Sequence, residues 1–211
     1  MKETTNYYTL ARPEIANVVP KGIKAILDIG TGEGYFLKLI KEQIGCETWG
    51  IEVNAAAAEV AKKNADRLIS GKIEDVLNSI PDGYFDCITF NDVLEHMVEP
   101  AEILKMVKAK LSENGIIIAS IPNVRYFFNL YEVLVKKDWE YKDAGILDST
   151  HLRFFTQKSM KSMIEKAGYQ MVSQTGLNEI ISWKFQLFNL LTLGMFTDTR
   201  YLQFICIAKK S

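Results

Sequence analysis

The chain has 211 residues, of which 48% are hydrophobic and 24% charged, a composition that builds a sizeable core and excludes an intrinsically disordered protein. Its 25 basic and 26 acidic side chains lack the basic excess of a nucleic-acid-binding protein, so we expect no nucleic-acid partner. The N-terminus has no apolar signal-peptide core, and the three cysteines have no metal-ligand or redox spacing, which together predict a cytoplasmic protein.

Strand-like and helix-like segments alternate from Ala25 to about Ala119. The expected strands are Ala25–Ile29, Thr48–Glu52, Leu68–Ser70, Phe85–Phe90 and Ile116–Ser120, the last one entered through an Asn114-Gly115 turn. The expected helices are Tyr35–Ile44, Ala55–Ala65 with Asn54 as its N-cap, and Pro100–Leu111. This alternation predicts an α/β fold with a parallel sheet, helices on both faces, and a ligand beyond the carboxyl ends of the strands.

The alternation breaks in residues 122–150, a stretch rich in aromatic and polar side chains. We expect this insertion after the fifth strand to form a cap over the ligand-binding edge of the sheet. The pattern then resumes with a helix over Gln157–Ala167 that Gly168 ends, and with strands over Met171–Thr175 and Tyr201–Ala208. Residues 1–211 are expected to form one domain.

The first expected strand leads into three glycines and then a helix, an arrangement that holds an anionic or polar ligand at the helix N-terminus. Gly30, Gly32 and Gly34 have G-x-G-x-G spacing, unlike the G-x-G-x-x-G of dinucleotide-binding proteins. Asp28 precedes them, where a carboxylate would repel a pyrophosphate but suit the amino group of a methionine moiety. Glu52 ends the second strand, where it can accept both hydroxyls of a ribose. The alternative is that these two acids are a turn residue and a solvated strand end.

Three stretches resemble motifs of class I S-adenosylmethionine-dependent methyltransferases. Residues 27–34 resemble the first-strand motif, residues 84–96 the fourth-strand motif, and residues 111–118 the entry to the fifth strand. The resemblance runs from about Tyr7 to Ala167. It implies a Rossmann-like, mostly parallel sheet of seven strands with the last strand antiparallel, and S-adenosylmethionine as cofactor with S-adenosylhomocysteine as product.

Residues 120–125 and 147–156 resemble, more narrowly, a bacterial subgroup that occurs beside polysaccharide genes or is similar to ubiquinone-type O-methyltransferases. The resemblance implies an enzyme that methylates an oxygen or nitrogen of a small polar acceptor, such as a sugar or a sugar-linked carrier. Two alternatives stay open: a module that binds S-adenosylmethionine without catalysis, and an NAD-linked oxidoreductase.

The resemblance also implies roles for individual residues. Arg12 would bind the cofactor carboxylate, and Asn91 would offer its backbone carbonyl near the sulfonium or amino group. Lys72 replaces the Asp that the family usually has against the adenine, so Glu74 or the backbone of Ile73 would read the base. The full cofactor-binding set that we expect is Tyr8, Arg12, Asp28, Gly30, Thr31, Gly32, Glu52, Val53, Ile73, Glu74 and Asn91.

The chain has two histidines, His96 and His151, and both fall in these motifs. Either could serve as a general base or bind the acceptor. Alternatively, His96 is a structural partner at a helix terminus, and residues 151–153 fix the cap to the domain. Asp92 and Glu95, with the two imidazoles, form a set that could hold a divalent metal or simply pack at the strand end. No metal is assigned on the sequence.

Aromatic and arginine side chains of the cap and its return segment are expected to frame the acceptor pocket. They are Arg125, Tyr126, Trp139 and Arg153. Such a set suits a sugar, an aromatic ring or a phosphorylated carrier. The alternative is that the aromatic side chains form the core of the cap.

The stretch from Ile180 to Phe196 is rich in Leu, Phe and Ile. It contains Lys184, Gln186 and Asn189 and is shorter than the roughly 20 residues that span a bilayer, so we expect no membrane span. We expect a helix that closes the acceptor pocket or forms a homodimer face, because monomers rarely expose so many large apolar side chains.

Overall fold

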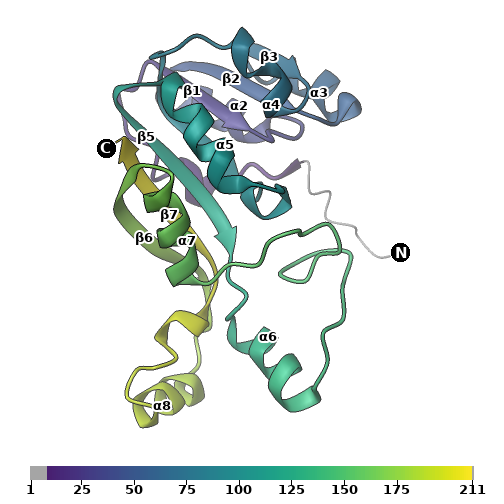
Figure 1. The fold of residues 1–211 in the computed structure, drawn as a ribbon, viewed down its shortest axis with the longest axis vertical. Helices are drawn as coiled ribbons and strands as arrows, with labels where there is room; N and C mark the ends of the chain where they lie inside the picture. The colour runs from purple at the N-terminus through teal and green to yellow at the C-terminus, as the bar shows by residue number, and fades with distance from the viewer. Residues whose placement is uncertain (1–8, 211) are drawn as a thin grey trace.

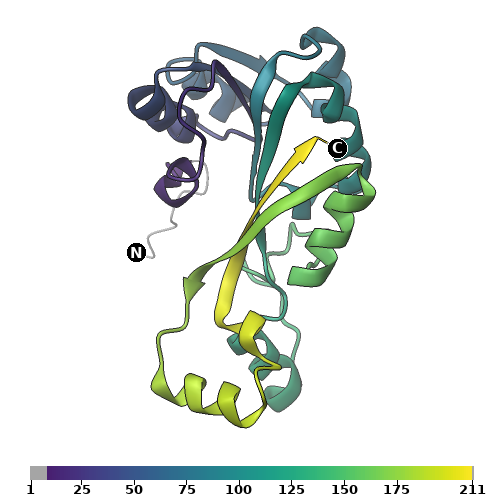
Figure 2. The same ribbon diagram turned by 90° about the vertical axis from the view of Figure 1, so that its left-hand side faces the viewer.

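The computed structural model describes residues 9–210, which form a seven-stranded sheet with helices on both faces (Figures 1 and 2). The strand order is β3-β2-β1-β4-β5-β7-β6. Neighbours among β1 to β5 pair in parallel, whereas β7 runs antiparallel to both β5 and β6. The Rossmann-like fold expected from the sequence, with an antiparallel last strand, is therefore confirmed.

The strands are β1 Ala25–Ile29, β2 Glu47–Glu52, β3 Arg67–Ser70, β4 Phe85–Asn91, β5 Leu111–Pro122, β6 Tyr169–Glu179 and β7 Tyr201–Lys210. The α-helices are α1 Pro13–Ala16, α2 Tyr35–Ile44, α3 Ala55–Ala61, α4 Ile73–Val76, α5 Pro100–Val107, α6 Phe127–Tyr131, α7 Gln157–Lys166 and α8 Trp183–Leu191. Short 3-10 helices are η2 Leu77–Ser79, η3 Leu94–His96, η4 Lys108–Lys110 and η6 Thr197–Arg200, and η5 Glu132–Lys136 is a π-helix.

Each face of the sheet has its own apolar core. Helices α1 and α2 cover one face and α5 and α7 the other (Figures 1 and 2). The first pair contributes Ile15, Phe36 and Ile40 to its core, and the second pair contributes Leu104 and Ile164. The relative exposure of all five side chains is 2% or less, and each such burial contributes about 1.5–3 kcal/mol. These two cores fix the carboxyl ends of the strands in space, and the candidate site lies at that edge.

The structure differs from the sequence expectations where a strand or helix ends. Asn114-Gly115 is not a turn but part of β5, and the register between β4 and β5 shifts between Phe85 and Cys87. The expected 180–196 helix is wrong in extent, because Leu193 and Gly194 have positive φ angles of 54° and 78° and α8 ends at Leu191.

Helices α6 and α8 form a lobe that stands off one end of the sheet (Figures 1 and 2). They pack through Phe127, whose ring centroid lies 5.5 Å from that of Phe185 and 5.7 Å from that of Phe188. The 122–150 insertion therefore joins the apolar helix near the C-terminus, a pairing that the sequence pattern did not predict. No helix in residues 9–210 is long and apolar enough to cross a membrane.

Candidate active site

Asp28, at the end of β1, is the most deeply buried acid of the glycine loop, with a relative exposure of 1%. Thr89 donates a hydrogen bond to its Oδ1 at 2.6 Å, and the side-chain amide of Asn91 donates to the same atom at 3.1 Å. Burial, opposed by these hydrogen bonds, raises the pKa of Asp28 to about 7. A cation bound beside this carboxyl would relieve the cost of burying its charge, so the position fits the amino group of a methionine moiety.

Glu52 holds the glycine loop in place from the end of β2. Its two carboxyl oxygens accept hydrogen bonds from the backbone N–H of Gly32 at 2.7 Å and of Asn54 at 2.8 Å. Asn54 also caps α3, because its side chain accepts from the N–H groups of Ala56 and Ala57. Each oxygen of this buried carboxylate keeps a further lone pair, so Glu52 could also accept the hydroxyls of a ribose.

Two pockets adjoin at Gly30. The larger one, of about 290 Å³, is lined by Val53, Ile73, Glu74 and Val93, and Lys72 lies at the same wall. This apolar slot with a carboxylate fits an adenine. Gly30 has a φ of 74°, which favours glycine, and a Cβ at this position would lie 2.6 Å from a methyl carbon of Val93. The lack of a side chain at Gly30 therefore lets the loop lie close to Val93 in the pocket wall.

The smaller pocket, of about 30 Å³, lies at the glycine loop where the methionine half of the cofactor is expected, and it is too small to hold that half without movement of its lining. Its lining includes Arg12, Gly30, Thr31, Gly32 and Asn91. Apart from Asp28 and Glu52, the sequence-predicted cofactor residues among 9–210 line these two pockets. Asp28 and Glu52 lie at the ends of β1 and β2, next to the glycine loop. Tyr8 lies outside the described residues. That these residues bind S-adenosylmethionine stays a prediction.

The guanidinium of Arg12 has ion-pair and hydrogen-bond partners near the ends of the strands, so it does not project alone into the cofactor pocket. Its guanidinium pairs with Asp92 at 2.7 Å and with Glu14 at 3.0 Å, and it donates to Ser120 at 2.7 Å. Gln203 of β7 donates to the other oxygen of Asp92 at 2.6 Å. Asp92 is held with a positive φ of 55°, a backbone conformation that Asp tolerates but rarely adopts. Sequence reasoning missed Gln203, since it is 111 residues from Asp92 and carries no motif.

The structure brings both histidines together beside Glu95. The ring centroids of His96 and His151 lie 4.7 Å apart, and His151 Nε2 lies 4.0 Å from Glu95 Oε1. The carbonyl oxygen of Glu95 accepts the backbone N–H groups of Leu152 and Arg153 at 2.8 and 2.9 Å. These hydrogen bonds fix residues 151–153 against η3, which agrees with the alternative that this stretch holds the cap to the domain. They also place His151 in one polar cluster with Glu95 and His96.

Burial is the main influence on the ionisation of this cluster. Burial and the neighbouring Asp92 raise the pKa of Glu95 well above its ordinary value. Burial lowers the pKa of His96, although its hydrogen bond to Thr150 opposes the shift. A neutral imidazole is the form that accepts a proton, so this environment suits a general base.

A pocket of about 250 Å³ shares Leu10, Arg12 and Asp92 with the smaller pocket at the glycine loop. The cap contributes residues 143–146 and Asp148, η3 contributes Glu95, and β7 contributes Leu202 and Gln203. His151 also lines it. Because Arg12 and Asp92 line both this pocket and the methionine pocket, an acceptor bound here would face the methyl donor.

None of the four residues expected to frame the acceptor lines this pocket. Arg125 is engaged by Asp198, through Nε at 2.6 Å and Nη2 at 3.2 Å, and Arg153 donates to the carbonyl of Val98. Trp139 packs on Phe154 with centroids 5.2 Å apart, and Tyr126 packs on Phe128 at 5.7 Å. The alternative reading, that these aromatic side chains pack within the cap, agrees better with the contacts. Arg125 and Arg153 already have acidic and carbonyl partners within the chain, and their role at the acceptor stays a prediction.

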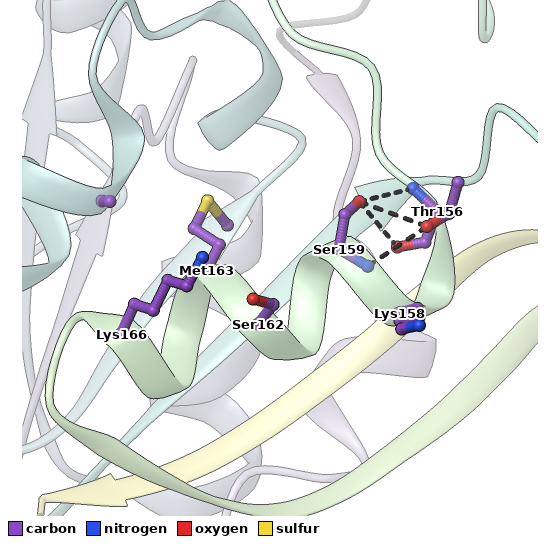
Figure 3. A pocket seen from close by; sticks show the side chains of 7 residues that line it. Thr156, Lys158, Ser159, Ser162, Met163 and Lys166 are labelled. Carbon is purple, nitrogen blue, oxygen red and sulfur yellow. Dashed lines mark hydrogen bonds between the residues drawn. The ribbon is translucent and has the colours of Figure 1, made fainter.

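Another hollow, of about 540 Å³, lies along α7 (Figure 3). Its lining includes Lys158, Ser162 and Lys166 but no residue of the glycine loop. Thr156 and Ser159 cap the helix reciprocally, so the first turn already has partners for its N–H groups. We assign it no part in the candidate site.

The affinity for S-adenosylhomocysteine is expected to fall as the pH drops below 7. The ammonium of the ligand needs Asp28 ionised, and below its pKa of about 7 the free protein holds a proton there that binding must displace. The dissociation constant should therefore rise by up to about tenfold per pH unit below that point. Calorimetry at pH 5.5 and 8, in two buffers of different ionisation enthalpy, measures both the affinity and the proton release. An affinity independent of pH over this range, with no proton release, would contradict the assignment.

Comparisons with known proteins show the family of the chain. A family model described as a methyltransferase domain matches residues 6–174. The chain is 33% identical over 103 residues to the mitochondrial ubiquinone biosynthesis O-methyltransferase of Schizosaccharomyces pombe, a match covering 46% of this chain and 37% of that protein. It is 25% identical over 163 residues to the ubiquinone biosynthesis O-methyltransferase of Acinetobacter baylyi, covering 74% of this chain and 67% of that protein. The match to the S. pombe protein spans less than half of that relative.

Solved structures share the fold. An S-adenosylmethionine-dependent methyltransferase from Archaeoglobus fulgidus superposes with a TM-score of 0.65 at 22% identity, covering 90% of this chain and 87% of that chain. One from Mesorhizobium loti gives 0.63 at 15% identity, covering 95% and 98%. The cyclase SpnF gives 0.63 at 15% identity, covering 94% and 79%. Since one of these neighbours is named a cyclase, the fold by itself does not fix the reaction.

Proposed function

The chain belongs to the methyltransferase-domain family of class I S-adenosylmethionine-dependent enzymes, and from this premise we propose that it transfers a methyl group to an oxygen of a small polar acceptor. The observation that carries the proposal is the placement of two buried carboxylates, Asp28 and Glu52, on either side of the glycine loop, one suited to an ammonium and one to a ribose. The names of the curated relatives, all O-methyltransferases among those compared, favour oxygen over nitrogen as the attacked atom.

S-adenosylmethionine supplies the activated methyl group, and the protein supplies alignment and shielding from water. Asp28 would hold the amino group, Glu52 the ribose, and Glu74 or the backbone of Ile73 the adenine. Arg12 would hold the carboxylate, in exchange for part of its pairing with Asp92. These contacts would hold the donor beside Arg12 and Asp92, which also line the acceptor pocket.

The acceptor hydroxyl loses a proton when its oxygen attacks the methyl carbon, and we assign the base to the imidazole pair. His151 Nδ1 lies 2.9 Å from the carbonyl oxygen of Ile146. Because a carbonyl only accepts, Nδ1 carries the hydrogen, and the lone pair is on Nε2. His151 Nε2 is the proposed acceptor of the proton, and His96 packs edge-on against the same ring.

The proposal is tested by methyl incorporation from labelled S-adenosylmethionine into a small-molecule extract, followed by isolation of the labelled product. We expect incorporation into a low-molecular-weight hydroxyl compound, lost in His151→Ala. Tight binding of S-adenosylhomocysteine with no incorporation across extracts and a defined panel of hydroxyl acceptors would favour instead a module that binds the cofactor without catalysis.

Helix α8 does not contribute to the lining of the acceptor pocket, so we propose the other role expected for the 180–196 stretch, a homodimer face. Leu190, Leu191 and Leu193 have relative exposures of 72%, 75% and 90%. Leu134 and Val135 on η5, the helix that follows α6, are also exposed, so the lobe of α6 and α8 carries several large apolar side chains at its surface.

The dimer proposal makes a direct prediction for sedimentation. The wild-type chain is expected to sediment as a dimer, and Leu190→Glu combined with Leu191→Glu is expected to sediment as a monomer, because burying two carboxylates at the interface is costly. Val172→Glu on β6, also at an exposed apolar residue, is the matched control and should leave the dimer intact. A wild-type monomer at about 100 μM would contradict the proposal.

A further inference from the structure

The pocket of about 290 Å³ next to Gly30, the adenine slot, has two opposite charges in its wall. They are Lys72 and Glu74, on either side of Ile73 where the chain passes from β3 into α4. Among the described residues that line the slot, His96 has the third polar side chain, and the others are glycine or apolar. The lysine and the glutamate are therefore the charged groups that a bound base would meet.

Neither charge is neutralised by a neighbour within residues 9–210. Lys72 is the N-cap of α4, but its side chain makes no capping hydrogen bond. In this part of the chain the side chains of Lys72 and Glu74 form no hydrogen bond or ion pair, with each other or with a third residue. An ammonium without a partner, on a flexible stem at the wall of an otherwise apolar pocket, is a donor open to a ligand.

The stretch from Gly71 to Glu74 lies beside the residue expected to hold the ribose. β3 pairs with β2 so that Ser70 lies opposite Glu52, and the N–H of Gly71 donates to the carbonyl oxygen of Glu52 at 2.9 Å. A ribose held by the carboxylate of Glu52 would therefore bring its base to this stretch. The edge of adenine that faces away from the sugar carries N1, the 6-amino group and N7.

Two valines of the slot are exposed in the unliganded chain. Val53, after β2, and Val98, after η3, have relative exposures of 62% and 64%, whereas Ile51 and Ile73 of the same lining are buried. A flat base bound here would cover apolar surface, which favours binding but does not distinguish one purine from another. Recognition of the base must come from polar groups at its edge.

We propose that Lys72 is a specificity-determining residue of the cofactor site, whose ammonium donates to a ring nitrogen of the adenine while Glu74 accepts from the 6-amino group. The edge of adenine presents that amino donor between two acceptors, N1 and N7, so an ammonium beside a carboxylate matches it. A lysine can only donate, whereas the aspartate usual in the family can only accept, so position 72 has the opposite hydrogen-bonding role in this chain. The proposal rests on the proposed function only in placing S-adenosylmethionine in this slot.

The test compares wild-type protein with Lys72→Met, which keeps an unbranched side chain of similar length and removes its charge. Calorimetry measures the binding of S-adenosylhomocysteine and of its 1-deaza, 7-deaza and 3-deaza forms, in each of which a C–H replaces one ring nitrogen. We expect Lys72→Met to weaken S-adenosylhomocysteine about tenfold. Wild-type protein should lose about tenfold with either the 1-deaza or the 7-deaza form, and Lys72→Met should lose no further affinity with that form, because the two changes remove the same hydrogen bond.

The form that shows this coupling identifies the nitrogen that Lys72 contacts. N3 lies on the sugar-bearing side of the base, so the 3-deaza form should change the affinity of both proteins by the same factor. Lys72→Arg keeps a charged donor and should bind S-adenosylhomocysteine more tightly than Lys72→Met does.

Lys63→Met, in the turn after α3, removes an exposed lysine that does not line the slot and is the matched control, with no expected change for any ligand. An unchanged Tm shows that Lys72→Met is folded, and Lys72→Gln replaces it if the Tm falls. If the neutral variant binds S-adenosylhomocysteine as wild type does, or if every deaza form costs both proteins the same factor, the proposal is overturned, whereas the cofactor assignment would still stand. If wild-type protein does not bind S-adenosylhomocysteine at all, the proposed function fails and this proposal fails with it.

Discussion

Asp28→Asn is expected to weaken S-adenosylhomocysteine binding about 100-fold, the largest effect of any single substitution in the cofactor site. The change removes the buried charge that meets the ligand ammonium, and a hydrogen bond between charged partners is worth about 1.5–3 kcal/mol. It keeps an oxygen that can still accept from Thr89, so the end of β1 should hold its shape.

The same substitution should stabilise the unliganded protein at pH 8. The pKa of Asp28 is raised from 3.8 to about 7 by folding, so the folded protein binds a proton between these values that the unfolded chain does not. Stability from this group is therefore lost as the pH rises through that window, by up to about 4 kcal/mol at pH 8. Asparagine has no charge to bury, and urea unfolding at pH 8 should show a gain of about 1–4 kcal/mol that disappears at pH 4.

A second ligand separates the role of Asp28 from a general disturbance of the loop. 5′-Methylthioadenosine has the adenine and ribose but no amino acid, so its affinity should change by no more than about threefold in Asp28→Asn. An equal loss for both ligands would show that the residue supports the loop rather than contacting the methionine half.

Glu52→Gln is expected to weaken both ligands, by about 10–100-fold. Two ribose hydroxyls would lose a charged acceptor, and one of the backbone N–H groups of Gly32 and Asn54 would face the amide NH₂ instead of an oxygen. Calorimetry with S-adenosylhomocysteine and 5′-methylthioadenosine measures the effect directly.

The two substitutions therefore predict different patterns, since Asp28→Asn affects one ligand and Glu52→Gln affects both. Glu47→Gln, at the other end of β2, is the control for the second substitution and should change neither affinity. If Glu52→Gln bound 5′-methylthioadenosine as wild type does, the ribose assignment would be wrong.

The first half of the fold was predictable because short buried strands and amphipathic helices leave clear periods in a sequence. β1 and α2 begin and end where the pattern predicted, at Ala25–Ile29 and Tyr35–Ile44. The errors arose where a tertiary contact overrides a local preference. Asn114-Gly115 has the composition of a turn, but Gly115 is buried against Leu111 and Phe85 and continues β5.

The candidate cofactor site was predictable for a different reason. Asp28, the glycines and Glu52 lie at the ends of consecutive parallel strands, and that topology brings strand ends together at one edge. No comparable topological rule predicts the acceptor pocket from the sequence. Its wall comes from η3, the cap and β7, and Gln203 reaches Asp92 across 111 residues of chain.

Arg125 shows the same limit of sequence-based prediction, because its partner in the structure is also distant in the sequence. A guanidinium in a cap predicts an anionic ligand only if no acid of the protein already pairs with it, and Arg125 pairs with Asp198 across 73 residues. The pocket that the structure shows is acidic instead. Its lining includes Asp92, Glu95, Asp143 and Asp148, which disfavours the phosphorylated carrier among the expected acceptors and leaves the sugar and the aromatic ring.

The assignment of the cofactor to the loop between Asp28 and Glu52 is tested most directly by thermal denaturation of wild-type protein and Asp28→Asn at pH 8. Each is heated with S-adenosylhomocysteine or NADH at about 100 times the wild-type dissociation constant for S-adenosylhomocysteine. S-adenosylhomocysteine is expected to raise the Tm of the wild-type protein by several degrees and that of Asp28→Asn by little or nothing, and NADH to raise neither. Stabilisation by NADH, or an undiminished shift with S-adenosylhomocysteine in Asp28→Asn, would contradict the account.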